Sequence, residues 1–513
     1  MNAKLLGILG LLVVLCGFMA IMTSDPWYDI FNGTFLRPNN IENLLRRSAM
    51  YGLLGIGVAF VIITSGIDLS VGSIVCLSGV LLAIFLGVEY RAFDDQPIIE
   101  VRAKTREILI PGATDSFKPG DRIRYFGGRR ARTAIVGIVD VETDGLRSLL
   151  TVDEELSRDD TLGHIAKVLP ISSFEATESS DDTEPADTVT LDGDHSYLSP
   201  RDEIVFVHPE SGLKQMKVAL VLATPDQTRI TLGDHLGNTF NAEWLAIPLE
   251  RRQRMPSPLA LLAVLGIAVS LGLIHGLLTT RMKLQPFVVT LCGLLIYRGL
   301  SRWLANDDPV GFENEYVTTL SPLGNGKLIL TTWQDATGNI ATFGIPYPLF
   351  VLVVVAILAA VFLNRTIWGR YLLALGRNEE AALYSGINTQ RVKLLAYIIC
   401  TTLAFVGGAL FALDSNSISP SSFGNFFELY AIAAAVLGGC SLRGGEGSIL
   451  GVIIGTAVMQ VLNNVIVLLK ISGTLEFAII GSVILIGVLA DEAFKSISAK
   501  RRAIAQTRQT SGG

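Results

Sequence analysis

Apolar residues dominate the two outer parts of the chain, whereas charged residues break up the middle. Nearly uninterrupted apolar segments of about twenty residues recur before residue 89 and again after residue 255. A helix needs about 20 such residues to cross the ~30 Å hydrocarbon core of a bilayer. The pattern therefore predicts about ten membrane-spanning helices, at residues 5–23, 48–65, 71–88, 257–279, 285–304, 347–364, 394–413, 428–440, 447–469 and 475–491.

The segment between residues 89 and 255 has a different pattern. Its apolar residues fall in short, alternating or β-branched runs separated by Gly, Pro and Asp, which is typical of strands and turns. FKPGDRIRYF at 117–126 is similar to LSPRDEIVFV at 198–207, with an offset of 81 residues. We therefore expect a soluble all-β domain made of two copies of one module, joined by the acidic segment 174–187.

Composition and charge support this division. Half of the 513 residues are hydrophobic and only 17% are charged, and the mean hydropathy is +0.48. These values are typical of a polytopic α-helical membrane protein. Residues 89–255 hold 30 acidic and 20 basic residues, whereas the rest of the chain holds 17 acidic and 21 basic ones. We expect a first membrane part at 1–88, an extracytoplasmic β insert at 89–255, a second membrane part at 256–495 and a cytoplasmic tail at 496–513.

Basic residues predict the orientation of these spans. With ten spans, the loop with Arg281 and Lys283, the loop 364–393 and the tail share one face, which the positive-inside rule makes cytoplasmic. Arg46 and Arg47 fall on the opposite face and count against the arrangement. The N-terminal apolar run resembles a signal peptide, but it is as long as a span and no cleavage site follows. We therefore expect it to be retained as the first span.

Cysteine, histidine and glycine patterns argue against a metal centre or a nucleotide site on this chain. All five cysteines lie in apolar or glycine-rich stretches, and the five histidines lack metal-ligand spacing. The glycine-rich run 437–448 lacks the GxxxxGK[ST] order of a phosphate-binding loop. We expect no catalytic residue, no metal and no cofactor here, so that any ATP chemistry takes place on another subunit.

The stretch IITSGIDLSVGS at 62–73 interrupts an apolar region with polar groups. Gly66 and Gly72 permit a break between two spans, and Ser70 is one of four hydroxyls that could pair with the freed backbone groups. Asp68 follows the break. We expect it to cap the next helix at the membrane surface, with direct contact to a passing substrate as the alternative.

Two further polar features lie near the end of the chain. LGGCSLRGGEGS at 437–448, with Gly438 and Gly439, does not permit a continuous helix. Asn463 and Asn464 are polar positions in apolar surroundings, which mark either a transport pathway or a hydrogen bond between helices. The sequence leaves both interpretations open.

The loop 364–393 is the longest polar loop on the predicted cytoplasmic face. Its segment RNEEAALYSG predicts a short amphipathic helix, with Asn378 near the cap and Glu379 in the first turn. Gly386 is the expected stop signal of that helix.

Four segments taken together resemble the permease subunits of ribose- and xylose-type sugar ABC importers. They are VIITSGIDLSVGSIVCLSG at 61–79, QPFVVTLCGLLIYRGLSRWL at 285–304, WGRYLLALGRNEEAALYSGINTQRVK at 368–393 and AVLGGCSLRGGEGSILGVIIGTAVMQVLNN at 435–464. The resemblance covers nearly all of 1–88 and 257–495, whereas the insert has no counterpart in the usual family pattern.

This resemblance implies that loop 364–393 docks in a groove of a cytoplasmic ATPase subunit, with Ala382, Leu383 and Ile387 on the docking side. The candidate coupling residues are Gly369, Arg370, Gly376, Asn378, Glu379, Ala382, Gly386 and Ile387. The candidate residues of helix breaks or the translocation path are Gly66, Asp68, Ser70, Gly72, Gly438, Gly439, Asn463 and Asn464.

The resemblance further implies a homodimer in the bacterial inner membrane that imports a pentose-type monosaccharide. An extracytoplasmic sugar-binding protein would deliver the substrate, ATP and Mg²⁺ would bind the partner ATPase, and no nucleic acid would be involved. Two other classes stay open. The β insert could be the working part of a membrane-anchored sensor or scaffold, or the chain could be a secondary transporter that uses Asp68 or Glu476 to couple an ion.

Overall fold

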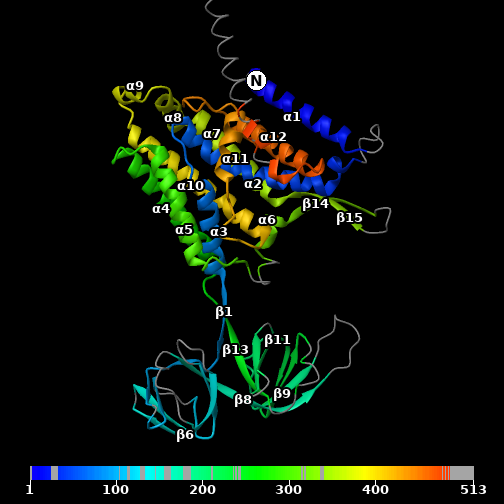
Figure 1. Cartoon of the computed structure of the whole chain (residues 1–513), viewed down its shortest axis with the longest axis vertical. Coiled ribbons are helices and arrows are strands. Elements are labelled where there is room, and N and C mark those ends of the chain that lie inside the picture. Colours follow the sequence, from blue (N-terminus) through cyan, green and yellow to red (C-terminus); the bar gives the residue numbers. More distant parts are fainter. Residues whose placement is uncertain are drawn as a thin grey trace, which may run out of the picture. The chain divides into compact units, whose positions relative to one another are not determined.

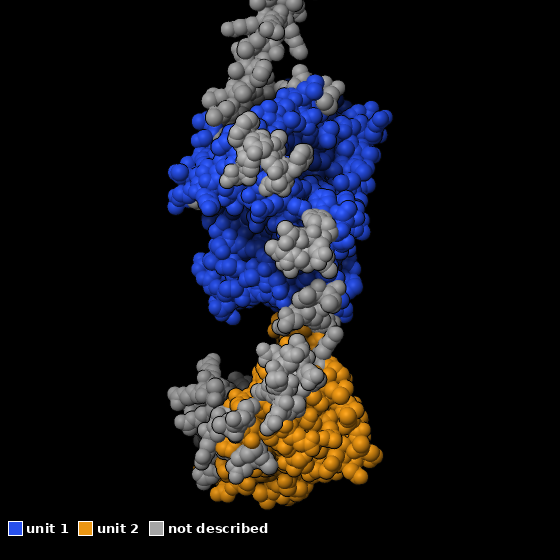
Figure 2. Space-filling view, turned by 90° about the vertical axis from the view of Figure 1, so that its right-hand side faces the viewer, with its two compact units in different colours: residues 1–87, 255–513 blue, residues 88–254 orange. Residues whose placement is uncertain are grey.

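The chain forms two compact units, residues 1–87 with 255–513 and residues 88–254 (Figure 2). The computed structural model describes residues 3–24, 33–102, 104–112, 116–126, 133–144, 146–154, 163–176, 187–200, 202–208, 212–234, 236, 240, 244–312, 316, 319–334, 340–475, 478–479, 481–482 and 485. We call the first unit the helical unit and the second the β insert.

Helices build the first unit, together with one β-hairpin (Figure 1). The helices are α1 (Ala3–Met22), α2 (Pro38–Ile63), α3 (Val71–Leu86), α4 (Ser257–Thr280), α5 (Pro286–Leu304), α6 (Ser321–Asn325), α7 (Tyr347–Arg365), α8 (Ile367–Arg377), α9 (Glu379–Tyr384), α10 (Thr389–Ser415), α11 (Phe427–Leu437) and α12 (Ile449–Leu468). The hairpin pairs β14 (Lys327–Gln334) with β15 (Ile340–Pro346), and single 3₁₀ turns lie at Thr34–Leu36 and Gly473–Leu475.

Seven of these helices are long and apolar enough to cross a membrane, namely α1, α2, α4, α5, α7, α10 and α12. Two shorter apolar helices, α3 and α11, stand where two more spans are expected. Most of the tenth expected span at 475–491, with Glu476, and the whole tail at 496–513 lie outside the described residues. The described part therefore establishes a polytopic helical unit, while the total of ten spans stays a prediction.

Helix α2 is the centre of this unit. It packs against α7, α10, α11 and α12, and every residue from Ala49 to Ile63 is buried. Because this segment is apolar on all its faces, it can be surrounded by other helices without leaving a charge unpaired. The helix begins at Pro38, ten residues before the predicted start at residue 48.

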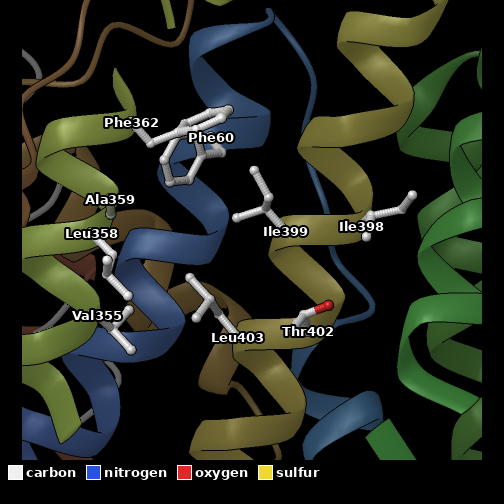
Figure 3. Close-up of a pocket in the computed structure, with 9 residues that line it drawn as sticks. All are labelled: Phe60, Val355, Leu358, Ala359, Phe362, Ile398, Ile399, Thr402 and Leu403. Atoms are coloured by element: carbon white, nitrogen blue, oxygen red, sulfur yellow. The ribbon is translucent and has the colours of Figure 1, made fainter. Parts of the chain in front are cut away.

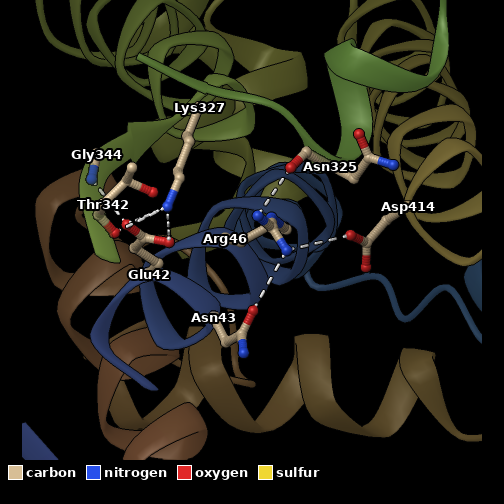
Figure 4. A network of polar contacts seen from close by, with 8 residues as sticks. All are labelled: Glu42, Asn43, Arg46, Asn325, Lys327, Thr342, Gly344 and Asp414. Atoms are coloured by element: carbon tan, nitrogen blue, oxygen red, sulfur yellow. Dashed lines mark hydrogen bonds and ion pairs between the residues drawn. The ribbon is translucent and has the colours of Figure 1, made fainter. Parts of the chain in front are cut away.

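The charged first turns of α2, which the hydropathy pattern excludes from the span, have partners in the tertiary structure (Figure 4). Glu42 is buried, and its carboxylate accepts hydrogen bonds from Lys327 Nζ at 2.9 Å and from the Gly344 N–H at 2.7 Å. These bonds attach the β14–β15 hairpin to α2. A buried charge is tolerated only when such partners compensate for its lost hydration.

Arg46, four residues further along α2, joins three other segments (Figure 4). It donates to Asn43 Oδ1 at 3.2 Å and to the Asn325 carbonyl oxygen at 2.8 Å, and it forms an ion pair with Asp414 of α10 at 3.6 Å. Arg46 thus has a structural role at this end of the bundle, which reduces its weight as an argument about orientation.

The β insert is an all-β, barrel-like unit. Its strands are β1 (Val88–Ala92), β2 (Gln96–Pro97), β3 (Glu100–Arg102), β4 (Glu107–Pro111), β5 (Arg122–Phe126), β6 (Thr133–Thr143), β7 (Arg147–Val152), β8 (His164–Glu175), β9 (Thr188–Asp192), β10 (Glu203–His208), β11 (Gly212–Ala223), β12 (Gln227–Leu232) and β13 (Leu245–Gln253). All described pairs in it are antiparallel, and the strand order is β1-β13-β10-β11-β12-β9-β8-β5-β6-β7-β4-β3, with β2 beside β8.

The internal duplication seen in the sequence recurs in the strand pairing. β5, β6, β7 and β4 pair in the same order as β10, β11, β12 and β9. The register shifts between Ile138 and Asp140 in one copy and between Val218 and Leu220 in the other. Each copy has its own apolar core, one around Ile123 and one around the equivalent Ile204.

The same aspartate closes the same turn in each copy. The Lys118 N–H donates to Asp121 Oδ2 at 2.9 Å, and the Ser199 N–H donates to Asp202 Oδ2 at 2.7 Å. Both pairs are related by the 81-residue offset. The repeated sequence motif is therefore a repeated turn, in which a short acidic side chain holds the backbone ahead of a strand.

Candidate functional site

Three segments that the sequence analysis marked separately meet at one place in the helical unit, which we call the junction. They are the break between α2 and α3 at residues 64–70, the end of α8 in the loop 364–393, and the glycine-rich turn 438–448 between α11 and α12. The contacts between them join residues more than 300 positions apart in the chain.

Ser65 is the centre of the junction. Its hydroxyl lies 2.9 Å from the Arg443 carbonyl oxygen and 3.3 Å from the Gly376 carbonyl oxygen. Its φ of 61° is left-handed, which is uncommon for a residue with a side chain. The Gly445 N–H donates to the Ile63 carbonyl oxygen at 2.9 Å, so the turn satisfies a carbonyl that the end of α2 leaves open.

Gly376 lets the loop approach the break directly. A Cβ at this position would overlap the Ile63 carbonyl oxygen and the Gly445 nitrogen. Only glycine fits here without moving one of the three segments. Gly376 therefore brings α8 into direct contact with both the end of α2 and the glycine-rich turn.

The two helices of the loop begin at side-chain caps. The Thr366 side chain accepts from the Gly369 N–H at 3.2 Å at the start of α8, and Asn378 Oδ1 accepts from the Ala381 N–H at 2.9 Å at the start of α9. Gly386 follows α9 with a φ of 81°, the left-handed conformation common after a helix end. The local signals at Asn378 and Gly386 thus correspond to the observed ends of α9.

The exposed side of α9 differs from the predicted one. Ala382 is buried, and Ile387 is half-buried against the core of the helical unit. Leu383 and Tyr384 are instead 58% and 89% exposed. The expectation that Ala382 lies on a docking side is therefore wrong, because α9 turns that face towards its own chain.

The polar residues around α9 hold it in place and leave other charges exposed. Glu379 Oε2 accepts from Lys393 Nζ at 2.7 Å, which ties the first turn of α9 to α10. Arg370 is exposed on α8. Gly369 faces the end of α7, where a Cβ would overlap the carbonyl oxygens of Phe362 and Leu363.

Asp68 is not the cap of α3 that the sequence predicted. It is fully buried, and its Oδ1 accepts from the Ser70 N–H at 2.9 Å and the Ser70 hydroxyl at 2.6 Å. Ser70, not Asp68, is the N-cap residue of α3. Asp68 therefore shapes the turn before the helix, and the prediction that it caps α3 is wrong.

A buried polar cluster that the sequence analysis did not identify surrounds Asp68. It contains His275 of α4, Tyr297 of α5, and Tyr397 and Cys400 of α10, each in electrostatic interaction with Asp68. The Tyr297 hydroxyl lies 2.8 Å from His275 Nε2, and the Tyr397 ring lies edge-on to the His275 ring.

Three atoms of this cluster have no hydrogen-bond partner among the described residues. They are Asp68 Oδ2, His275 Nδ1 and the Tyr397 hydroxyl. Buried polar atoms without partners are costly, so such a place is suited to water or to a polar ligand. The cluster offers hydroxyl, imidazole and carboxylate groups inside an otherwise apolar bundle.

Three of the four remaining candidate glycines mark close approaches between segments. Gly72 lies within α3, not in the break as predicted, and a Cβ there would overlap Glu428 and the Gly424 carbonyl oxygen. A Cβ at Gly66 would lie 3.0 Å from the Tyr397 hydroxyl, and one at Gly438 would lie 2.6 Å from the backbone of α12. Gly439 has a φ of 90° and open space around it.

The two asparagines of α12 have different surroundings. Asn464 and Asn40 of α2 exchange hydrogen bonds through their side chains, at 2.8 and 3.2 Å. Asn464 thus fits the interhelical alternative. Asn463 Oδ1 is buried and has no partner among the described residues, so the pathway alternative stays open for this position.

A separate hollow of about 450 Å³ lies between α2, α7 and α10 (Figure 3). Its lining residues are Phe60, Val355, Leu358, Ala359, Phe362, Ile398, Ile399, Thr402 and Leu403. Thr402 is the single polar residue of this lining, so the hollow lacks the hydrogen-bonding groups that a sugar needs. Across the described residues, no cluster of His, Cys, Asp and Glu could hold a metal ion either.

Comparison with known proteins identifies the family of this chain. A family model described as "branched-chain amino acid transport system / permease component" matches residues 230–489, just over half of the chain. The chain belongs to this family of permeases. Together with the seven long apolar helices among the described residues, this membership makes the chain a multi-pass protein of the bacterial inner membrane.

Several curated relatives in this family are sugar import permeases. The ribose import permease of Escherichia coli K12 is 34% identical over 234 residues, which cover 45% of this chain and 68% of the relative. The ribose import permease of Bacillus subtilis 168 is 37% identical over 42% of this chain and 62% of its own length. The xylose transport permease of Haemophilus influenzae is 29% identical over 47% of this chain and 76% of its own length. No solved structure matches the chain.

Proposed function

We propose that this chain is the transmembrane permease subunit of an ATP-driven importer of monosaccharides. The family is one of transport permeases, and the relatives include proteins named for ribose, fructose, galactose and xylose. Ribose and xylose are pentoses, which makes a pentose the first substrate to test. The chain itself performs no covalent chemistry in this proposal.

The junction is the observation that carries the proposal. In this proposal a cytoplasmic ATPase subunit drives import. Its movement must therefore pass from the loop that it binds to the helices that line the substrate path. Here the loop with α8 and α9 touches the break between α2 and α3 through Gly376 and Ser65. The break also leads to Asp68 and its buried polar cluster. One rigid connection thus extends from an exposed short helix to polar groups inside the bundle.

The exposed apolar side chains of α9 support a docking role for the loop. Leu383 and Tyr384 project from a short, capped helix that Lys393 holds at one end. A helix that presents such side chains next to charged residues can lie in a groove of a partner protein. The partner in this proposal is a cytoplasmic ABC ATPase, which binds the ATP and Mg²⁺.

Three further elements complete the proposal. A soluble sugar-binding protein delivers the substrate from outside, the permease is a homodimer, and the β insert is extracytoplasmic. The polar cluster around Asp68 supplies hydrogen-bonding partners for a neutral, polyhydroxylated substrate. An uncharged sugar requires no fixed counter-charge, so Asp68 acts as a hydrogen-bond acceptor.

Reconstitution tests this function against its rivals. The chain is placed in proteoliposomes with its ATPase and binding protein, and uptake of radiolabelled ribose and xylose is measured with and without ATP. Uptake that requires ATP and the ATPase supports the proposal. Uptake that follows a proton or sodium gradient without the ATPase would instead identify a secondary transporter, with Asp68 as the first coupling candidate.

A further inference from the structure

The β insert is joined to the helical unit through a two-stranded ribbon with an unusual charge pattern. β1 pairs with β13, and Glu89 lies opposite Arg252 while Arg91 lies opposite Glu250. Residues opposite each other in an antiparallel pair, and residues two apart along a strand, project from the same face. Arg91, Arg252 and Arg254 therefore share one face of the ribbon with Glu89 and Glu250.

Glu89 does not neutralise Arg252, the residue directly opposite it. Its Oε1 accepts from Arg254 Nε at 2.7 Å, and its Oε2 accepts from an Arg91 terminal nitrogen at 3.0 Å. The hydrogen bond from Arg254 lowers the pKa of Glu89, so this carboxylate is ionised near neutral pH. Arg252 is exposed and has no hydrogen-bond or ion-pair partner among the described residues.

These four side chains line a hollow of about 330 Å³. Three guanidinium groups around one carboxylate leave an excess of positive charge in it, and Glu250 is not part of its lining. Guanidinium groups bind phosphate with paired N–H donors in a matching planar geometry. The hollow thus has the charge and the donor groups for a phosphate.

The charge of the ribbon is opposite to that of the rest of the insert. Residues 88–92 and 250–254 hold four arginines and two glutamates, while the other residues of 89–255 hold 16 basic and 28 acidic residues. An acidic body repels anions in general. The positive ribbon is thus the part of the insert suited to an anionic ligand.

Chain connectivity places this ribbon next to the membrane whatever the orientation of the insert. Arg91 follows the last residue of α3 by five positions, and Arg252 precedes the first residue of α4 by five. Five extended residues span at most about 17 Å. Both strands therefore hold the arginines within reach of the lipid headgroups at the ends of these two helices.

We propose that Arg91, Arg252 and Arg254 bind the phosphate group of an anionic membrane lipid. Arg252 supplies the unneutralised charge, while Glu89 holds the other two arginines in place. The bound lipid ties the ribbon to the bilayer surface. Basic groups close to a membrane gain affinity for anionic lipids through this kind of contact.

The test counts lipids bound to the full-length protein in detergent by native mass spectrometry. Phosphatidylglycerol is titrated against phosphatidylcholine for the wild type, Arg252→Gln, Arg252→Lys and the control Arg229→Gln. Arg252→Gln breaks no hydrogen bond to a described residue. Arg229 is an exposed arginine of β12 paired with Glu175 at 2.7 Å, so its variant removes one charge elsewhere on the same insert.

We expect Arg252→Gln to lower the affinity for phosphatidylglycerol roughly fivefold, with Arg252→Lys between it and the wild type. The control should bind like the wild type, since its site lies away from the ribbon. Equal losses in Arg252→Gln and Arg229→Gln would overturn the proposal. So would an affinity of Arg252→Gln for phosphatidylglycerol equal to that of the wild type.

Discussion

The hydroxyl oxygen of Ser65 lies 2.9 Å from the carbonyl oxygen of Arg443, although 378 positions separate the two residues in the chain. The same hydroxyl reaches the Gly376 carbonyl oxygen. These contacts join an interrupted helix, a glycine-rich turn and the loop proposed to bind an ATPase. The junction is therefore where the proposed coupling is most sensitive to a small change.

Replacement of Gly376 by alanine should uncouple the permease. The added Cβ would overlap backbone atoms of Ile63 and Gly445, and relief of such overpacking costs about 1–3 kcal/mol. We expect ATP-dependent uptake to fall strongly in proteoliposomes. The matched control is Gly299→Ala on α5, where a Cβ meets nothing within 4 Å. Full uptake by Gly376→Ala, or equal loss in both variants, would show that the close contact does not matter.

The exposed end of α9 should decide binding of the ATPase. Leu383→Ala and Tyr384→Ala remove the apolar side chains that project from this helix, and we expect co-purification of the ATPase to be lost while the permease still inserts. Leu213→Ala is the control, because Leu213 is 56% exposed in the β insert and Leu383 is 58% exposed. Glu379→Arg should also weaken the complex, since it replaces the partner of Lys393 by a like charge. Retention of the ATPase by all three α9 variants would exclude this docking site.

The Lys327–Glu42 pair should behave as a buried ion pair. Lys327→Met leaves the Glu42 carboxylate buried beside the Gly344 N–H without its cation, and breaking such a pair costs about 3–5 kcal/mol. The double variant with Glu42→Leu removes both charges and should recover most of the lost stability. Melting temperatures of the detergent-solubilised protein measure this difference. A double variant less stable than the single one would show that the pair is not the source of the effect.

The β insert should be accessible from outside the cell. In a cysteine-free background, Asp226→Cys at the exposed turn between β11 and β12 should react with an impermeant thiol reagent added to spheroplasts. Tyr384→Cys on α9 should react only after the membrane is opened. The reverse labelling pattern would place the insert in the cytoplasm, and the predicted orientation of the spans would then be wrong.

The carboxyl group of Asp94 should make the folding stability of the β insert depend on pH. Burial raises the pKa of this carboxyl above its ordinary value of 3.8, because the charged form loses hydration in the folded insert. Its ionisation therefore opposes folding at pH 7, and this penalty disappears as the pH falls below about 3.9, where the carboxyl is protonated in both states. Asp94→Asn should raise the melting temperature of the insert at pH 7 but not at pH 3. A rise of equal size at both pH values would point to a cause other than charge.

Local patterns predicted the long apolar helices and the strand-rich insert, but not the β14–β15 hairpin. Nine predicted spans coincide with described helices, because an apolar run of this length has few other stable forms in a membrane. Asn378 and Gly386 fixed α9 because caps act within one turn of the helix. The similarity between residues 117–126 and 198–207 predicted two copies of one module, and Asp121 and Asp202 close the same turn in each copy.

The hydropathy pattern and the local helix signals did not predict features that depend on residues distant in the sequence. The predicted span began at residue 48, yet Glu42 and Arg46 belong to α2, where Lys327 and Asp414 compensate for their charges. Ala382 was placed on the exposed side of α9, but the packing of the loop against its own chain buries it. His275 gave no signal at all, since a lone histidine shows neither spacing nor periodicity.

The sequence by itself determined the kind of protein, its division into a helical part and a β insert, and the positions of the helix breaks. Each of these depends on composition, on periodicity or on the chemistry of adjacent residues. Only the tertiary structure decided that Ser65, Gly376 and Arg443 meet, and that Asp68 lies among His275, Tyr297 and Tyr397. Such contacts depend on how separate helices pack together, and packing joins residues whose distance along the chain carries no information about their distance in space.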